Sequence, residues 1–322
     1  MQYRHLGRAG VRVSAISLGS WLTYGGSVEE ETAIQCIHTA YEQGITFFDT
    51  ANVYNRGATE KVVGRALKDY SRNSYVLATK VYFPMGEGPN DRGLSRKHIM
   101  EQCNASLRRL GTDYIDLYQC HRYDTETPLE ETLRALDDLV SQGKVLYVGV
   151  SEWSATQISD AVYMAREYNL DRIVSNQPIY NMLTRYIERD VIPLCEREGI
   201  GQVVFSPLAE GILTGKYKPG QQPQHGTRAA DENSNMFMKD LMTDKTLTAV
   251  QKLQEVAQQG GYTLPHLALA WVLRQQNISS AIIGASRPQQ VLENVKAADI
   301  TLSDDLLKRI DEVLDGIPTY ER

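Results

Sequence analysis

Eight short apolar runs alternate along the chain with amphipathic helical segments, and this order predicts an α/β fold, a (β/α)8 TIM barrel. Eight strand–helix units match the number that closes a parallel barrel, and a length of 322 residues is usual for such a barrel as one domain. A doubly wound open sheet is the alternative on spacing alone. No G-x-G-x-x-G follows any predicted strand, which disfavours that alternative.

The predicted elements begin with a hairpin, Tyr3 to Leu6 and Val11 to Ser14, turned by G-R-A-G and placed to cap one end of the barrel. In the first helical segment, Ala33, Ile37 and Ala40 fall on one face, which is the spacing of an amphipathic helix. The predicted strands are 15–18, 45–48, 75–79, 114–118, 145–150, 173–175, 203–205 and 281–283. The predicted connecting helices are 29–43, 58–69, 95–110, 128–142, 154–168, 186–198, 263–275 and 288–297.

Two helical segments, 244–259 and 302–314, exceed this repeat and are predicted to be extra helices. The stretch 206–243 is rich in Gly, Pro, Gln and Asn, and loops of that length usually have a function. We interpret it as a cover over the site at the carboxyl-terminal face of the barrel. No shift in composition marks a second domain, so residues 1–322 are predicted to form a single barrel domain.

Composition excludes several functional classes. Hydrophobic residues make up 42% and charged residues 23%, as in ordinary globular chains. A net charge of −6 argues against nucleic-acid binding, which needs clustered cations. No apolar stretch approaches the roughly 18 residues of a membrane span, and none near the start is long enough for a signal peptide. The four cysteines lack metal-site spacing, so we expect a cytoplasmic protein with reduced thiols, no membrane insertion and no metal.

Four polar side chains of types suited to catalysis follow consecutive predicted strands, where barrel enzymes place their active sites. Asp49 and Tyr54 lie in F-F-D-T-A-N-V-Y after the second strand, Lys80 follows the third, and His121 follows the fourth. Taken singly, each has a structural explanation, such as a helix cap, a salt bridge or core packing. Taken together, an acid, a phenol, an amine and an imidazole converge on one rim.

This set predicts general-acid catalysis by Tyr54. A phenol with a pKa near 10 is a poor proton donor at neutral pH, and the ammonium group of Lys80 is expected to lower that pKa. Asp49 would keep Lys80 protonated, and His121 would orient a substrate carbonyl group. General-acid catalysis contributes about 10²–10⁴ in rate. A proton alone does not reduce a carbonyl group, so a bound nicotinamide is implied as the hydride donor.

Later strand ends offer contacts for such a nucleotide. The amides of Asn176 and Gln177 match the donors and acceptors of a carboxamide, Ser151 lies on the neighbouring strand end, and Phe205 is placed to stack on a pyridine ring.

After the last strand, G-A-S-R offers the close backbone approach of Gly284, the donors Ser286 and Arg287, and the start of a helix, which together predict a phosphate site. Arg287 and Arg228 would pair with a 2′-phosphate and thereby select NADP over NAD.

These segments together resemble the aldo-keto reductase family across essentially the whole chain. The motifs that carry the resemblance are L-G-S-W (18–21), F-D-T-A-N-V-Y (48–54), T-K (79–80), Y-Q-C-H (118–121), S-P-L (206–208), G-I-L-T-G-K-Y (211–217) and the G-A-S-R segment. The resemblance implies a catalytic tetrad of Asp49, Tyr54, Lys80 and His121. The residues predicted to bind NADP(H) are Ser20, Trp21, Asp49, Ser151, Asn176, Gln177, Phe205, Ser206, Pro207, Leu208, Gly211, Lys216, Arg228, Gly284, Ser286, Arg287, Gln290, Glu293 and Asn294.

Within that family the chain resembles the branch that contains the β subunits of voltage-gated potassium channels, and this implies a homo-oligomer, a tetramer or a multiple of one. One departure bears on function: those β subunits usually carry Asn at the position of His121, whereas ordinary reductases carry His. We therefore favour a bacterial-type reductase over a channel partner. The strings that carry the resemblance are L-T-Y-G-G (22–26), R-G-L-S-R-K-H-I (92–99), T-L-P-H-L-A-L-A-W (263–271) and Q-Q-V-L-E-N (289–294).

Three functions stay open at this point. The favoured one is NADPH-dependent reduction of a small carbonyl substrate. The second is a nucleotide-sensing or channel-associated subunit with vestigial chemistry. The third, a metal-dependent hydrolase, lacks ligands at the end of the first strand, L-G-S-W. The aromatic residues Trp21, Tyr24, Tyr82 and Trp153 are predicted to line an apolar substrate pocket, although the same residues also suit loop packing.

Overall fold

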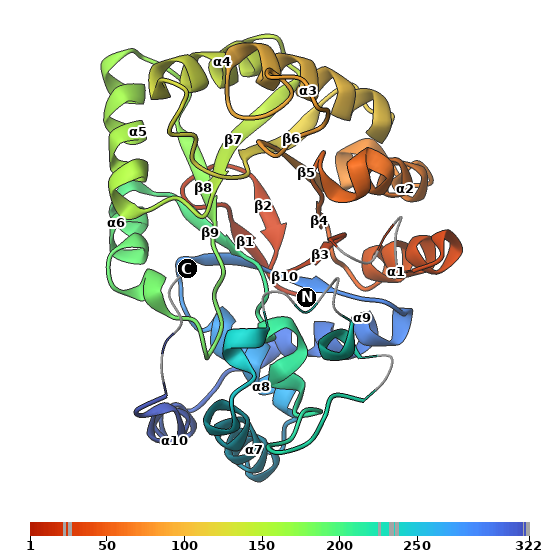
Figure 1. The fold of residues 1–322 in the computed structure, drawn as a ribbon, viewed down its shortest axis with the longest axis vertical. Coiled ribbons are helices and arrows are strands. Elements are labelled where there is room, and N and C mark those ends of the chain that lie inside the picture. The colour runs from red at the N-terminus through yellow and green to blue at the C-terminus, as the bar shows by residue number, and fades with distance from the viewer. Residues whose placement is uncertain are drawn as a thin grey trace.

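The computed structural model describes residues 1–21, 24, 28–224, 227–231, 235, 238–317 and 319. In this part of the chain, eight parallel strands close a barrel in the order β10-β3-β4-β5-β6-β7-β8-β9 (Figure 1). This confirms the predicted (β/α)8 barrel over a doubly wound sheet. The barrel strands are β3 (Ile16–Gly19), β4 (Phe47–Asp49), β5 (Val76–Val81), β6 (Ile115–Cys120), β7 (Val145–Ser151), β8 (Ile173–Gln177), β9 (Gly201–Val204) and β10 (Ile278–Gly284).

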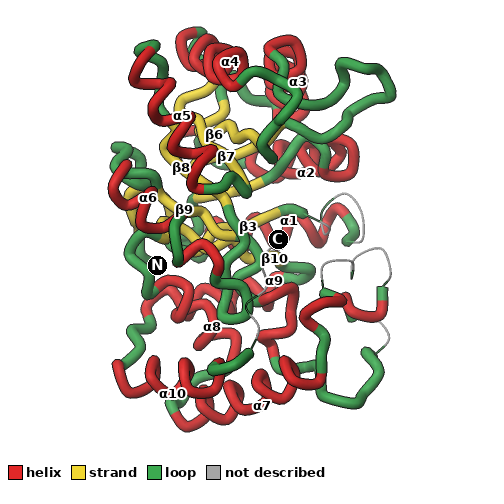
Figure 2. Tube along the Cα trace, turned by 60° about the vertical axis from the view of Figure 1, so that its left-hand side comes forward, coloured by secondary structure: helices red, strands yellow, loops and turns green. Residues whose placement is uncertain are grey.

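Helices surround the barrel, and two more lie outside the repeat, as predicted (Figures 1 and 2). The surrounding helices are α1 (Glu30–Glu42), α2 (Ala58–Leu67), α3 (Arg96–Leu110), α4 (Leu129–Ser141), α5 (Ala155–Glu167), α6 (Val191–Glu198), α8 (Leu264–Leu273) and α9 (Pro288–Asn294). The extra helices α7 (Asp244–Gln259) and α10 (Asp304–Leu314) pack against each other. Short 3-10 helices are η1 (Tyr54–Gly57), η2 (Arg72–Ser74), η3 (Tyr186–Glu188), η4 (Ala209–Thr214), η5 (Arg228–Ala230), η6 (Lys239–Leu241) and η7 (Val295–Asp299).

Local sequence explains where several helices begin. Ser154 caps α5 by accepting a hydrogen bond from the backbone of Gln157, whose side chain accepts one from Ser154 in return. Such caps stabilise a helix by about 1 kcal/mol. The helix predicted over 186–198 is instead η3 followed by α6. Pro193 explains the break, because its ring excludes a helical carbonyl group four residues earlier, at Arg189.

The N-terminal hairpin closes the amino-terminal end of the barrel. Its strands β1 (Tyr3–His5) and β2 (Arg12–Ser14) pair antiparallel. Leu6 and Val13 are buried among barrel-interior side chains such as Phe47. Gly7 has a φ of +58°, and a Cβ atom there would lie 2.3 Å from the carbonyl oxygen of Gly199, so only glycine fits this contact. The opposite, carboxyl-terminal end is therefore the open one.

The side chains inside the barrel change from apolar to polar along its axis, and the polar end marks the candidate site. Phe47 and Leu117 belong to the apolar cluster inside the barrel. Side chains on a strand alternate between faces, so Asp49 and Gln119, two residues later, point inward as well. The interior is thus apolar near the hairpin and polar at the carboxyl ends of the strands. In the part of the chain that the structure describes, no helix has the length and apolar character of a membrane span.

Candidate active site

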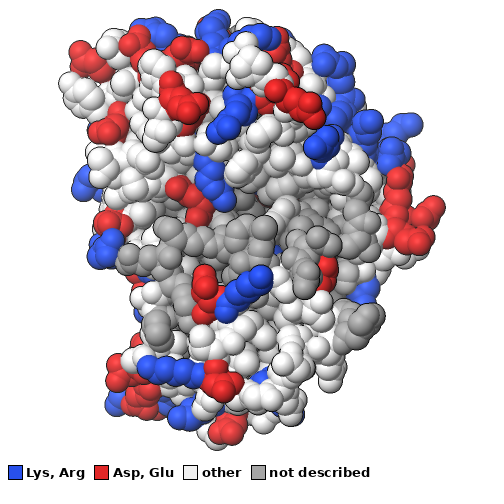
Figure 3. Space-filling model, in the orientation of Figure 1, with Lys and Arg blue, Asp and Glu red and all other residues white. Residues whose placement is uncertain are grey.

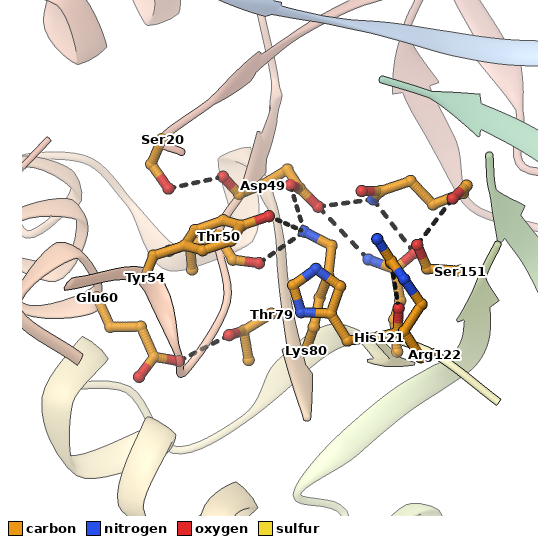
Figure 4. Close-up of polar contacts among 12 residues, drawn as sticks. Ser20, Asp49, Thr50, Tyr54, Glu60, Thr79, Lys80, His121, Arg122 and Ser151 are labelled. Carbon is orange, nitrogen blue, oxygen red and sulfur yellow. Dashed lines mark hydrogen bonds and ion pairs between the residues drawn. The ribbon is translucent and has the colours of Figure 1, made fainter. Parts of the chain in front are cut away.

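Lys80 lies at the centre of the polar cluster. Its side chain is fully buried, and its Nζ lies 2.6 Å from Oδ2 of Asp49 and 2.9 Å from the carbonyl oxygen of Thr50 (Figure 4). It also donates to the hydroxyl oxygen of Tyr54 at 3.3 Å. The structure thus brings three of the predicted catalytic residues into contact. It also corrects their setting, because Asp49 and Lys80 lie within β4 and β5 rather than after them.

Tyr54 reaches Lys80 through a tight turn between β4 and α2. Asn55 and Arg56, which follow it, have φ values of 46° and 49°, and Gly57 has a φ of 87°. Left-handed conformations are costly for residues other than glycine and occur often at functional sites. The turn returns the phenol over the strand ends while the chain continues into α2.

Glu60 on α2 stabilises the position of the Tyr54 turn relative to β5. Its buried carboxylate accepts a hydrogen bond from the hydroxyl group of Thr79 at 2.6 Å and one from Nε of Arg109 at 2.5 Å. Thr79 precedes Lys80 on β5, so Glu60 ties the helix that follows Tyr54 to the strand that carries Lys80. Sequence patterns alone did not reveal this contact.

His121 completes the predicted tetrad. It follows β6 directly, and its backbone N–H donates to the carbonyl oxygen of Val81 at 2.9 Å. Its ring stands edge-on to Tyr54, with 5.7 Å between ring centroids, and edge-on to Phe83 at 4.9 Å. Among the described residues, its buried Nδ1 has no hydrogen-bond partner. A substrate or ligand atom is the kind of group that satisfies such an orphan.

Charges in the cluster set the protonation states. Burial lowers the pKa of Lys80, but attraction to Asp49 and Tyr54 and the hydrogen bonds to both side chains together outweigh burial and raise the pKa above its usual value, so Lys80 is an ammonium. Burial, reinforced by the charges of Lys80 and Arg122, holds the pKa of His121 well below its usual value, so this imidazole is neutral at pH 7.

The pKa of Tyr54 corrects an expectation from the sequence. Lys80 does lower this pKa, as predicted, but burial of the phenol raises it more strongly, and Asp49 raises it further. The net pKa therefore lies above that of a free phenol. The sequence predicted only the first of these effects, because burial cannot be read from a strand-end motif.

Two glutamines hold the carboxylate of Asp49. Gln177 donates to its Oδ1 from Nε2 at 2.9 Å, and Gln119 donates to the same oxygen at 3.4 Å. Because Oδ2 bonds Lys80, both oxygens are occupied. Gln119 was missed, although it lies in the Y-Q-C-H motif two residues before His121. Strand alternation places it inside the barrel with Leu117 and would have found it.

The predicted nucleotide contacts on β7 and β8 divide into two groups. Ser151 is buried and donates to the carbonyl oxygen of Gln177 at 2.8 Å, so these two lie together at the site. Asn176 does not. Its amide donates to the side chain of Gln202 at 3.1 Å, and Gln202 in turn contacts the thiol of Cys195 on α6. Neighbouring strand residues point to opposite faces, so Asn176 faces the helix layer, and its predicted role is wrong.

The segment after β9 carries several other predicted contacts. Phe205 packs against the interior cluster, and Ser206 has a φ of 50° at the start of the turn that continues through Pro207, Leu208 and Gly211. Arg228 pairs with Glu210 at 3.1 Å and lies 5.2 Å from the ring centroid of Trp21. Trp21 is itself 6.5 Å from the Tyr54 ring, so this segment reaches the site. Lys216 is exposed at the surface.

The end of β10 adjoins the end of β3. Gly284 pairs with Gly19, which precedes Ser20, and Ser20 donates to the carbonyl oxygen of Asp49 at 3.0 Å. Beyond Gly284, both the backbone and the hydroxyl group of Ser286 donate to Gln290. The remaining predicted contacts vary in exposure: Arg287 is exposed, Glu293 is half-buried and bonded to Lys296, and Asn294 is buried.

The predicted substrate-pocket residues also separate. Trp21 and Tyr82 are half-buried near Tyr54 and Phe83, whereas Trp153 is buried against Tyr123 at 4.8 Å. Tyr24 is 2% exposed and packs in the core beside Cys36, so its predicted place in the pocket is wrong. The rest of L-T-Y-G-G, Leu22, Thr23, Gly25 and Gly26, lies outside the described residues. Phe83 and Arg122, which contact His121, were missed although each closely follows a strand.

Among the described residues, no group of three or more His, Cys, Asp or Glu side chains is placed to hold a metal ion. The face in Figure 3 mixes cationic and anionic side chains and is hollowed near its centre.

The fold and the site are thus a closed parallel barrel that holds an ammonium between a carboxylate and a phenol, beside a neutral imidazole, at the carboxyl ends of its strands. The model of the Aldo/keto reductase family matches residues 15–315. The chain belongs to this family of oxidoreductases, whose members generally bind NAD(P)H.

Relatives point to one branch of the family. The chain is 45% identical to the putative voltage-gated potassium channel subunit beta of Schizosaccharomyces pombe, over 98% of this chain and 94% of that protein. It is 41% identical to the probable voltage-gated potassium channel subunit beta of Arabidopsis thaliana and 40% identical to that of Oryza sativa subsp. japonica. Each of these two matches covers 99% of this chain and 98% of the relative. The resemblance noted in the sequence is confirmed.

Proposed function

We propose that this protein reduces aldehydes and reactive ketones to alcohols with NADPH, with Tyr54 as the general acid. The observation that carries the proposal is the position of Lys80, which contacts both Asp49 and the hydroxyl group of Tyr54. Burial raises the pKa of the Tyr54 phenol, and the adjacent ammonium group limits that increase. Tyr54 is thus protonated at neutral pH and next to a cation that stabilises the phenolate left after proton transfer.

His121 has a separate role in this scheme. A neutral imidazole carries one N–H donor, which is suited to a carbonyl oxygen. The low pKa of His121 keeps it in this form. Tyr54 and His121 then donate to the same oxygen, and Tyr54 delivers the proton. Asp49 holds Lys80 in place through a buried ion pair, since a lone ammonium would lose its proton in such a setting.

A bound NADPH supplies the hydride. The residues present fit a nicotinamide: Gln177 commits its N–H donors to Asp49 and Gln119, and no described residue bonds its Oε1, which leaves an acceptor for a carboxamide. Ser151 supports Gln177 through its backbone. We propose that the phosphates are bound by Lys216, Arg228, Ser286 and Arg287. The other residues predicted to bind NADP(H), except Asn176, are proposed to contact the rest of the nucleotide.

The test is NADPH oxidation with a panel of aldehydes, run for wild type and Tyr54→Phe and repeated with NADH. We expect turnover that favours NADPH and falls about 10²–10⁴-fold in the variant. Fluorescence titration of NADPH controls for intact binding in Tyr54→Phe. Equal turnover in wild type and variant would remove Tyr54 from the mechanism.

A second candidate is a nucleotide-binding regulatory subunit of a membrane channel with weak chemistry. The names of the three relatives favour it. His121 favours the reductase, because the family resemblance drawn from the sequence implies Asn at this position in channel β subunits and His in ordinary reductases. Tight NADPH binding with very slow turnover, together with recovery of a potassium channel in a pull-down, would support the second candidate. We further propose a cytoplasmic homo-oligomer, and light scattering tests its assembly.

A further inference from the structure

Arg122 is the cation of the site that the reduction scheme leaves unused. It follows His121, is half-buried, and donates from Nη1 to the carbonyl oxygen of His121 at 2.5 Å (Figure 4). Its guanidinium carbon lies 5.5 Å from the centroid of the Phe83 ring. Phe83 contacts the His121 ring, which contacts Tyr54. Arg122 is therefore fixed within the same aromatic group that surrounds the proton donor.

Its charge has no counterion in the described part of the chain. Lys80 is paired with Asp49, Arg228 with Glu210 and Arg109 with Glu60, whereas no described carboxylate forms a salt bridge with Arg122. Of the five N–H donors of a guanidinium group, one is used by His121. Among the described residues, the site therefore carries one positive charge, on Arg122, that has no salt-bridge partner and lies close to His121 and Tyr54.

The positive charge of Arg122 changes the pKa values of both Tyr54 and His121. Arg122 lowers the pKa of Tyr54 and that of His121 by Coulombic interaction. Such effects require proximity. A half-buried arginine is also the side chain best suited to bind an oxyanion through two parallel hydrogen bonds. Phe83 and Tyr82 beside it supply apolar surface for the carbon chain that joins the anion to a carbonyl group.

We propose that Arg122 selects carbonyl substrates that carry a carboxylate, by pairing with that carboxylate while the carbonyl oxygen lies between Tyr54 and His121. This inference rests on the proposed reductase function and narrows its substrate class from aldehydes in general to anionic aldehydes.

The experiment compares matched substrates. Succinic semialdehyde is set against butanal, and 4-formylbenzoate against its methyl ester, so that two spacings between carboxylate and carbonyl group are sampled. In wild type, kcat/KM is expected to favour the anionic member of at least one pair. In Arg122→Gln that preference falls roughly 10- to 100-fold, mainly through KM, while the neutral member changes much less. Arg122→Lys is expected to recover part of the preference, because lysine keeps the positive charge but lacks the two parallel N–H donors of the guanidinium group.

The neutral substrates separate substrate recognition from indirect effects. Arg122 also influences the pKa of Tyr54, so any loss shared equally by anionic and neutral substrates belongs to the proton donor. Arg134→Gln on α4 is the control, because it removes one exposed positive charge that takes no part in the contacts of Arg122 with Phe83 and His121. It should leave the preference for anionic substrates unchanged. No anionic preference in wild type at either spacing, or an equal loss on both members of each pair, would overturn the proposal.

Failure of the reductase function has a different signature. If wild type turns over none of the four compounds, 4-formylbenzoate and its methyl ester are titrated calorimetrically into the NADP⁺-loaded protein. Tighter binding of the anion that is lost in Arg122→Gln would uphold the anion site without catalysis. Equal or absent binding of both compounds would refute it.

Discussion

At the scale of single residues, the four ionisable groups Asp49, Tyr54, Lys80 and His121 share one buried site, where charge and burial together set their protonation. Lys80 is charged because Asp49 and Tyr54 together outweigh its burial, and His121 is neutral because of burial and nearby cations. The pairing makes chemical sense, since an ammonium beside a carboxylate resists deprotonation while an imidazole beside two cations resists protonation. The sequence motifs placed these groups together, but the strength of burial, which decides the Tyr54 pKa, depends on the fold around them.

The low pKa of His121 predicts a pH dependence of stability. Below about pH 6.5 the unfolded state takes up a proton at this histidine, whereas the folded state does not until its lower pKa is reached. The free energy of unfolding therefore falls as pH drops through that window. In His121→Asn the fall should be shallower by up to about 1.4 kcal/mol per pH unit, as measured by urea unfolding between pH 7 and 5. If the free energy of unfolding fell equally with pH in wild type and His121→Asn, His121 would not be held neutral in the folded state.

Elements rather than residues decide which end of the barrel is open. The hairpin β1–β2 fills the amino-terminal end, and the contact between Gly7 and Gly199 holds it there. Gly7→Ala should destabilise the fold by about 1–3 kcal/mol, because an added methyl group meets backbone at a left-handed φ. Gly10→Ala in the same turn is the matched control, since no atom lies within 4 Å of the place its methyl group would take. Equal unfolding midpoints for the two variants would mean that the hairpin is only loosely attached.

Alternation of strands and helices allowed the element order, the hairpin and both extra helices to be predicted, because burial patterns repeat with the period of each structure. The ends of strands were less accurate. Polar residues such as Lys80 were assumed to follow a strand, but the barrel buries them inside it. The same assumption grouped Asn176 with Gln177, although adjacent strand positions face opposite sides. Tyr24 shows that an aromatic residue near a site can equally belong to the core.

For the whole molecule, nucleotide binding should be visible as added stability. A ligand at about 100 times its Kd stabilises the folded state by about 2.7 kcal/mol. We expect NADPH to raise the unfolding midpoint more than NADH does at equal concentration, and Arg287→Gln to remove most of that difference. Differential scanning fluorimetry measures both. Identical shifts for the two nucleotides in wild type would contradict the proposed 2′-phosphate contact.

Tyr54 is proposed to donate the proton to the carbonyl oxygen, and single-turnover oxidation of bound NADPH by an aldehyde tests this role without interference from nucleotide release. Tyr163→Phe, which alters a 69% exposed tyrosine on α5, is the control for loss of a phenol hydroxyl group elsewhere. We predict a rate that falls about 10²–10⁴-fold in Tyr54→Phe and stays at the wild-type value in Tyr163→Phe. A wild-type rate in Tyr54→Phe would contradict the assignment of Tyr54 as the proton donor.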